Sequence, residues 1–124
     1  MIAYAALLGL SLWLNRADRK MLLLSALVGG SFFMEVPRGG PAEFYGVCLT
    51  IEVVLAVAAL AIGARASLIV AEICLVMVAA HIMGWLTNGY APLSPYKGIM
   101  FITEYAQIAV CILASRSAIE RLRN

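Results

Sequence analysis

The distribution of apolar residues along the chain is the feature that most limits how it can fold. Charged residues or glycine and proline separate five apolar segments: Ile2–Leu14, Met21–Val36, Phe44–Gly63, Ala66–Leu86 and Ile99–Ser115. The last three are close to the roughly 20 residues that an α-helix needs to cross a bilayer. We therefore expect an all-α protein whose helices lie in lipid.

The composition leads to the same class of protein. Hydrophobic residues make up 64% of the 124 residues, charged residues make up 13%, and the mean hydropathy is +0.96. A soluble domain has roughly 45–50% apolar and about 25% charged residues, and one core of this size could not bury so much apolar surface. The sequence predicts a single integral membrane domain over residues 1–124, folded as a polytopic transmembrane helical bundle.

The number of complete spans depends on the first two segments, which are shorter than the others. A charged stretch, residues 16–20, lies between them. They could be two short spans whose flanking side chains reach the interface, or a helical hairpin that enters the membrane and returns. We expect five spans, with three full spans plus a short N-terminal hairpin as the alternative.

The basic residues predict the orientation. With five spans and the N-terminus outside, one side carries most of them: Arg16, Arg19, Lys20, Arg65, Arg116, Arg121 and Arg123. The outer loops, Pro37–Glu43 and Thr87–Gly98, contain Arg38 and Lys97. Basic loops stay in the cytoplasm, so we expect a cytoplasmic C-terminus in a membrane of the bacterial inner (plasma) type.

Four ionisable residues interrupt the long apolar segments: Glu52, Glu72, His81 and Glu104. Such residues are costly in a bilayer and by default suggest function. In the predicted topology Glu52 lies roughly 12 Å below the outer end of its span, and His81 and Glu104 lie roughly 7–8 Å below theirs. The sequence therefore predicts a polar site in the outer half of the membrane that contains these three residues.

Two further residues support this predicted site through helical spacing. Gln107 is the i, i+3 neighbour of Glu104, and Tyr45 lies on the same stripe as Glu52. Glu72 does not fit, because about 100° of rotation per residue puts it on the helix face opposite His81. We expect Glu72 to make a separate intramembrane contact, toward the first two segments, a second subunit or the cytoplasmic interface.

Several classes of function are not expected. The net charge of +2 and the lack of a basic run argue against nucleic acid. No G-x-S-x-G, Walker or H-E-x-x-H motif occurs, so we expect no enzyme. His81 has no second histidine at i+4 and no C-x-x-C is present, so we expect neither a metal site nor a cofactor.

Two hypotheses of function remain. In the first, the chain is a non-enzymatic subunit or homo-oligomer of a membrane assembly. A pore is one such assembly, similar to those of small phage holins, which share its size, apolar character and basic end. In the second, it is a small proton- or cation-coupled transporter or channel that uses Glu52, His81 and Glu104. The first is favoured slightly, because one copy can scarcely enclose a pathway. Both imply the bilayer and further membrane subunits as partners.

Overall fold

The computed structural model describes residues 2–34, 41–86 and 93–123. These residues form five α-helices and no strand, as the sequence predicts. The helices are α1 (Ile2–Leu14), α2 (Arg19–Met34), α3 (Pro41–Ile62), α4 (Arg65–Leu86) and α5 (Leu93–Arg123).

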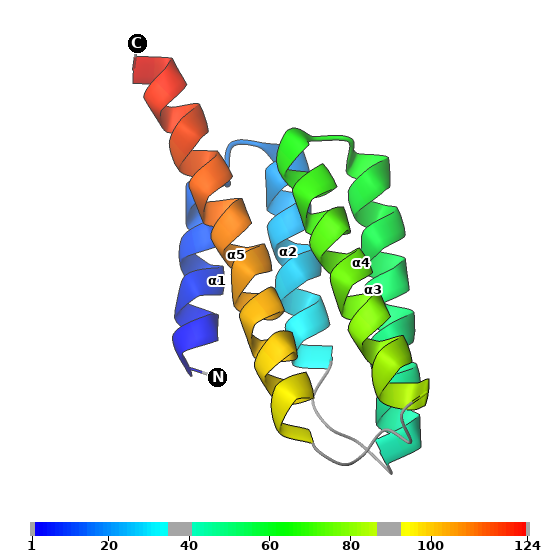
Figure 1. Cartoon of the computed structure of the whole chain (residues 1–124). Helices are drawn as coiled ribbons and strands as arrows, with labels where there is room; N and C mark the ends of the chain where they lie inside the picture. The colour runs from blue at the N-terminus through cyan, green and yellow to red at the C-terminus, as the bar shows by residue number, and fades with distance from the viewer. Residues whose placement is uncertain (1, 35–40, 87–92, 124) are drawn as a thin grey trace.

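The helices run alternately up and down and lie side by side as a bundle (Figure 1). Contacts of α2 with α3, α3 with α4, α4 with α5 and α5 with α2 close a ring of four helices. Helix α1 packs outside this ring, against α2 and α5. The ring thus encloses one interior, to which α3, α4 and α5 contribute the residues of the predicted site.

The two ends of the bundle differ in charge. One end carries the α1–α2 turn, the α3–α4 turn and the C-terminal part of α5, which extends beyond the other helices (Figure 1). The described basic side chains lie there and are exposed: Arg16, Arg19, Lys20 and Arg65. We call this the basic end. The opposite end, where α2 and α4 finish and α3 and α5 begin, is called the loop end.

Particular residues determine where the helices start and stop at the two short turns of the basic end. The carboxylate of Asp18 caps α2 by accepting hydrogen bonds from the amides of Lys20 at 3.0 Å and Met21 at 3.3 Å. Gly63 ends α3 with a φ of 71°, a left-handed conformation that favours glycine. Gly63 therefore lies outside the helix, although the predicted segment Phe44–Gly63 includes it.

Two helices begin earlier than the sequence indicates. Helix α3 begins at Pro41 and α5 begins at Leu93, inside the expected loops. Proline suits the first turn of a helix because the amides there have no carbonyl partner within the helix. Helix α5 also continues past Ser115 to Arg123, so the basic C-terminal segment belongs to it.

An aromatic cluster holds α1 against α2 and α5. Tyr4 is fully buried and stacks on Phe32 of α2 with a ring-centroid distance of 3.7 Å. Its edge contact with Tyr105 of α5 has a centroid distance of 5.4 Å. Such pairs stabilise packing by about 0.5–1.5 kcal/mol each beyond burial, so α1 is a packed part of the bundle.

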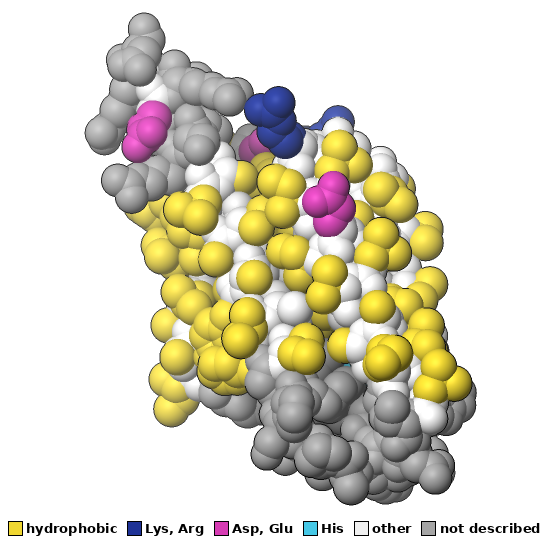
Figure 2. Space-filling view, viewed as in Figure 1, with side chains coloured by type: hydrophobic (Ala, Val, Ile, Leu, Met, Phe, Trp, Pro, Cys, Tyr) yellow, Lys and Arg dark blue, Asp and Glu magenta, His cyan; other side chains and the backbone are white. Residues whose placement is uncertain are grey.

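The surface of the bundle is largely apolar, whereas its interior holds many polar groups. Val54, Leu75 and Ile102 are 62%, 63% and 68% exposed. Figure 2 shows hydrophobic side chains across the middle of one face, with charged side chains near the basic end. The buried polar residues are Ser11, Asn15, Ser25, Ser31, Glu52, Ser67, His81, Gln107 and Ser115.

Several hydroxyl groups bond to the carbonyls of their own helices. Thr50 donates to Gly46 O at 2.8 Å, and Thr103 donates to Ile99 O at 2.8 Å. Ser67 donates to Ala64 O, the carbonyl just before its helix, at 2.7 Å. These bonds satisfy the hydroxyl donors without water.

One stretch of the described residues, Arg65–Met83 in α4, is long and apolar enough to cross a membrane by length and composition. Ile2–Leu14, Gly46–Ile62 and Phe101–Ser115 are apolar helical stretches that are shorter. The five-span topology and its three-span alternative therefore stay predictions.

Candidate functional site

Helix α3 places Glu52 in the bundle interior. The helical spacing of Cys48, Glu52, Leu55 and Ala59 puts them on one face, and all four are at least 97% buried. Glu52 itself has no exposed surface. A carboxyl group thus occupies the middle of an otherwise apolar buried stripe.

The surroundings of the Glu52 carboxyl group are poor in hydrogen-bond donors. Neither Oε1 nor Oε2 has a hydrogen-bond partner among the described residues. The thiol of Cys74, from α4, lies within electrostatic contact of the carboxyl group, and so does that of Cys48. Thiols are weak donors, and an unpaired charge is costly to bury.

Gln107 connects α5 to α4 beside Glu52. Its side chain is 1% exposed, and Nε2 lies 3.3 Å from Cys74 Sγ and 3.3 Å from Met77 Sδ. Both sulphur atoms are weak acceptors. Cys74 therefore belongs to the surroundings of both polar side chains, and Gln107 lies in the same interior as Glu52.

His81 lies in this interior, nearer the loop end. Cys74, Met77 and His81 share one face of α4 through i, i+3 and i+7 spacing, and His81 is 1% exposed. The axial distance from Cys74 to His81 is roughly 10 Å. The structure therefore places His81 about two helical turns beyond the level of Glu52.

Glu104 belongs to the same level as His81. It is half-buried and lies one turn before Gln107 on α5, which runs antiparallel to α4 (Figure 1). It also lies within electrostatic range of Cys48. The three predicted site residues thus form two layers, with Glu52 in the middle of the bundle and His81 and Glu104 closer to the loop end.

Of the two remaining predicted residues, Glu72 lies outside this interior. Glu72 is exposed on the outer side of α4, where it lines a shallow apolar depression with Leu68 and Leu75. The side chain of Tyr45 lies outside the described residues.

One layer of apolar side chains lies next to Glu52 on the side of the basic end, and buried serine and asparagine side chains follow beyond it. Leu55 and Ala59 follow Glu52 on α3, Val70 precedes Cys74 on α4, and Ile108 follows Gln107 on α5. All four are buried members of the hydrophobic core. Polar interior groups of α4 and α5 therefore lie between Glu52 and the loop end, and an apolar layer lies on its other side.

A second buried polar cluster, which the sequence analysis missed, joins α1, α2 and α5. Ser11 and Ser25 share a hydrogen bond of 2.7 Å. Asn15 Nδ2 donates to Ser11 O at 2.9 Å and to Cys111 O at 3.2 Å. The available signal was Asn15 directly after an apolar segment, on the same helix face as Ser11. Because these side chains are hydrogen-bonded to one another and to the backbone, we assign the cluster to helix packing.

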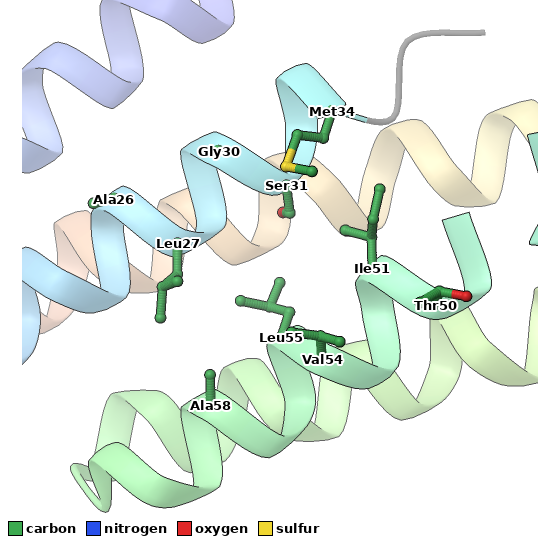
Figure 3. A pocket seen from close by; sticks show the side chains of 10 residues that line it. All are labelled: Ala26, Leu27, Gly30, Ser31, Met34, Thr50, Ile51, Val54, Leu55 and Ala58. Carbon is green, nitrogen blue, oxygen red and sulfur yellow. The ribbon is translucent and has the colours of Figure 1, made fainter. Parts of the chain in front are cut away.

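An apolar groove lies between α2 and α3 (Figure 3). Its volume is about 350 Å³, and it is open to the outside. Its two hydroxyl groups are satisfied, since Ser31 donates to Val28 O at 2.8 Å and Thr50 to Gly46 O. The lining residues are Ala26, Leu27, Gly30, Ser31, Met34, Thr50, Ile51, Val54, Leu55 and Ala58. The groove offers apolar contact and no reactive group.

Among the described side chains, no group of three or more His, Cys, Asp and Glu residues is placed to hold a metal ion. Among these side chains, the candidate site therefore consists of the buried carboxyl group of Glu52 and the sulphur and amide groups around it. Comparisons with protein-family models, curated proteins and solved structures give no match.

Proposed function

We propose that this chain is an integral membrane protein whose helices turn their apolar sides to lipid. Exposed Val54, Leu75 and Ile102 support this proposal, because such a surface is unfavourable in water and suits a bilayer. The Ser and Thr side chains bonded to their own helices agree with it, since lipid offers no partner for a free donor.

The proposed orientation follows from the charged end. Arg16, Arg19, Lys20 and Arg65 are exposed at the end from which α5 extends. We place this basic end on the cytoplasmic side of a bacterial-type inner (plasma) membrane, with the N-terminus outside. The loop end, and the approach to His81 and Glu104, then face outward.

Within this membrane protein, we propose a proton- or cation-coupled transport function centred on Glu52. The carrying observation is a fully buried carboxyl group, enclosed by one copy, whose oxygens meet no donor stronger than the Cys74 thiol among the described residues. A residue that joins subunits would lie at the outer surface, and one that only joins helices would form hydrogen bonds to them. An ion-binding carboxyl group needs neither a position at the outer surface nor hydrogen bonds to other helices.

His81, Glu104 and Gln107 have supporting roles in this proposal. His81 and Glu104 lie nearer the loop end, where imidazole and carboxyl groups can pass protons to and from Glu52. Gln107 holds α4 and α5 together through its contacts with Cys74 and Met77.

The test is ion flux in liposomes that contain the purified protein. We expect Glu52→Gln to abolish a flux that the wild type carries, and His81→Ala and Glu104→Gln to reduce it. Glu72→Gln is the matched control, because this glutamate is exposed outside the bundle. Equal flux in wild type and Glu52→Gln, with both proteins folded, would overturn the proposal.

A second candidate function is that of a structural subunit in a homo-oligomer or larger membrane assembly. The observation in its favour is Glu72, an exposed carboxylate beside Leu68 and Leu75 on the outer face of α4. A charge at a lipid-facing position is costly unless it reaches the interface or a partner. Native gels of Glu72→Gln test this candidate: loss of a higher-order species supports it, and unchanged migration contradicts it.

A further inference from the structure

We propose that the ion bound by Glu52 is a proton rather than a metal cation, and that it reaches Glu52 from the loop end. This inference rests on the transport function proposed above and names its ion and its direction of access. Three features of the interior support it: the ligand atoms near Glu52, the charges that face it and the polarity on its two sides.

The groups near Glu52 suit a proton better than an alkali or alkaline-earth cation. Such cations need about six oxygen ligands. The described groups near the Glu52 carboxyl group are the thiols of Cys48 and Cys74, and Glu104, near Cys48, adds a single further carboxyl group. The amide nitrogen of Gln107 points to sulphur as well. A proton needs a single lone pair, which the carboxylate supplies.

The titratable groups around Glu52 do not offer a fixed positive charge. Helix α3 contributes Cys48, α4 contributes Cys74 and, two turns away, His81, and α5 contributes Glu104. Helix α2, which packs against α3, has no titratable residue from Met21 to Met34. The described Lys and Arg side chains are all exposed. A proton is therefore the direct means of neutralising the carboxylate.

The polarity of the interior gives the direction. Toward the basic end, Leu55, Val70 and Ile108 form one layer without polar side-chain atoms. This layer separates Glu52 from the buried polar cluster of Ser11, Ser25 and Asn15. Toward the loop end, His81 and Glu104 can exchange protons with a neighbour or with water. In this conformation Glu52 exchanges its proton with the loop side and is sealed from the basic side.

The experiment uses dicyclohexylcarbodiimide, which adds to an un-ionised carboxyl group and gives a stable N-acylurea. The full chain is reconstituted in liposomes, and peptide mass spectrometry follows labelling at Glu52. We expect labelling to decline as the pH rises and to be unaffected by Na⁺, K⁺ or Ca²⁺. Glu52→Gln serves as the blank for this peptide, and Glu72→Gln should leave the labelling of Glu52 unchanged.

Sidedness is measured with different buffers inside and outside the vesicles, whose protein orientation is read from trypsin cleavage at the basic end. We expect labelling to follow the pH on the loop side alone. Labelling that follows the pH on the basic side would overturn the assigned direction.

The outcomes separate this inference from the proposed function. Protection of Glu52 by a metal cation, together with a cation flux lost in Glu52→Gln, would overturn the proton assignment and leave the transport function standing. Absence of labelling at every pH, together with an infrared spectrum in which Glu52→Gln removes no C=O band of an un-ionised carboxyl group, would overturn the inference. Proton flux that is lost in Glu52→Gln, with cation-independent labelling, would support both.

Discussion

Gly29 and Gly30 are adjacent glycines of α2 whose replacement by alanine should have different effects. A Cβ atom at Gly29 would lie 2.4 and 2.5 Å from the two Cδ atoms of Leu8 on α1. Carbon atoms rest at about 3.5–4.0 Å from one another. A Cβ atom at Gly30 would meet nothing within 4 Å, so the pair provides its own control.

The expected magnitudes follow from two terms. Alanine is better than glycine in a helix by about 0.8–1.0 kcal/mol, which applies at both positions. Overpacking costs about 1–3 kcal/mol and applies only where Leu8 must move. Gly30→Ala should therefore raise the free energy of unfolding by up to about 1 kcal/mol. The free energy of unfolding of Gly29→Ala should lie about 1 kcal/mol below that of Gly30→Ala, at the low end of this range, because the atoms that must move are the flexible end of the Leu8 side chain.

The assay is reversible unfolding in mixed micelles with increasing denaturing detergent, followed by circular dichroism. A double-mutant cycle adds Leu8→Ala, which removes the side chain that the new methyl group would meet. The penalty at Gly29 should then disappear, giving a favourable coupling energy between the two substitutions. Equal effects of Gly29→Ala and Gly30→Ala, or no coupling to Leu8, would refute the close packing of α1 on α2.

Three further substitutions test other parts of the structure. Asp18→Ala removes the cap of α2 and should lower the free energy of unfolding by about 1 kcal/mol in the same assay; no change would contradict the capping role. Asn15→Leu removes the bond from α1 to Cys111 O and should cost about 1–2 kcal/mol, whereas Ser115→Ala, which loses a bond within its own helix, should cost less. Val54→Arg tests the lipid-facing surface and should hinder membrane insertion of α3 by about 3 kcal/mol in a glycosylation-mapping assay; insertion equal to that of Val54→Leu would contradict a lipid-facing position.

Helix content and order could be predicted because the apolar segments are long and clearly separated. Ile2–Leu14 matches α1 residue for residue, since Asn15 and Arg16 follow it directly. The starts of α3 and α5 were predicted too late because proline was interpreted as part of a loop, although Pro41 and Pro95 suit a first helical turn. Helix geometry alone does not determine the number of membrane crossings, because that number also depends on the surrounding lipid.

The residues of the candidate site could be named from the sequence, but not their neighbours or levels. Glu52 and His81 stand out because charge is rare in apolar helices. Their separation into two layers depends on the register between helices, which the contacts of Cys74 with Glu52 and Gln107 reveal. Asn15 was missed because a polar residue at a segment end usually lies at the interface, whereas the packing of α1 buries it.

We propose that one membrane-embedded copy encloses an exchangeable carboxyl group at Glu52. Infrared spectroscopy of the reconstituted protein measures this most directly, through the C=O stretch of un-ionised carboxyl groups and its shift in D₂O. We expect a band that is present in the wild type and in Glu72→Gln and is missing in Glu52→Gln. A spectrum in which Glu52→Gln removes no such band at any pH would contradict the account.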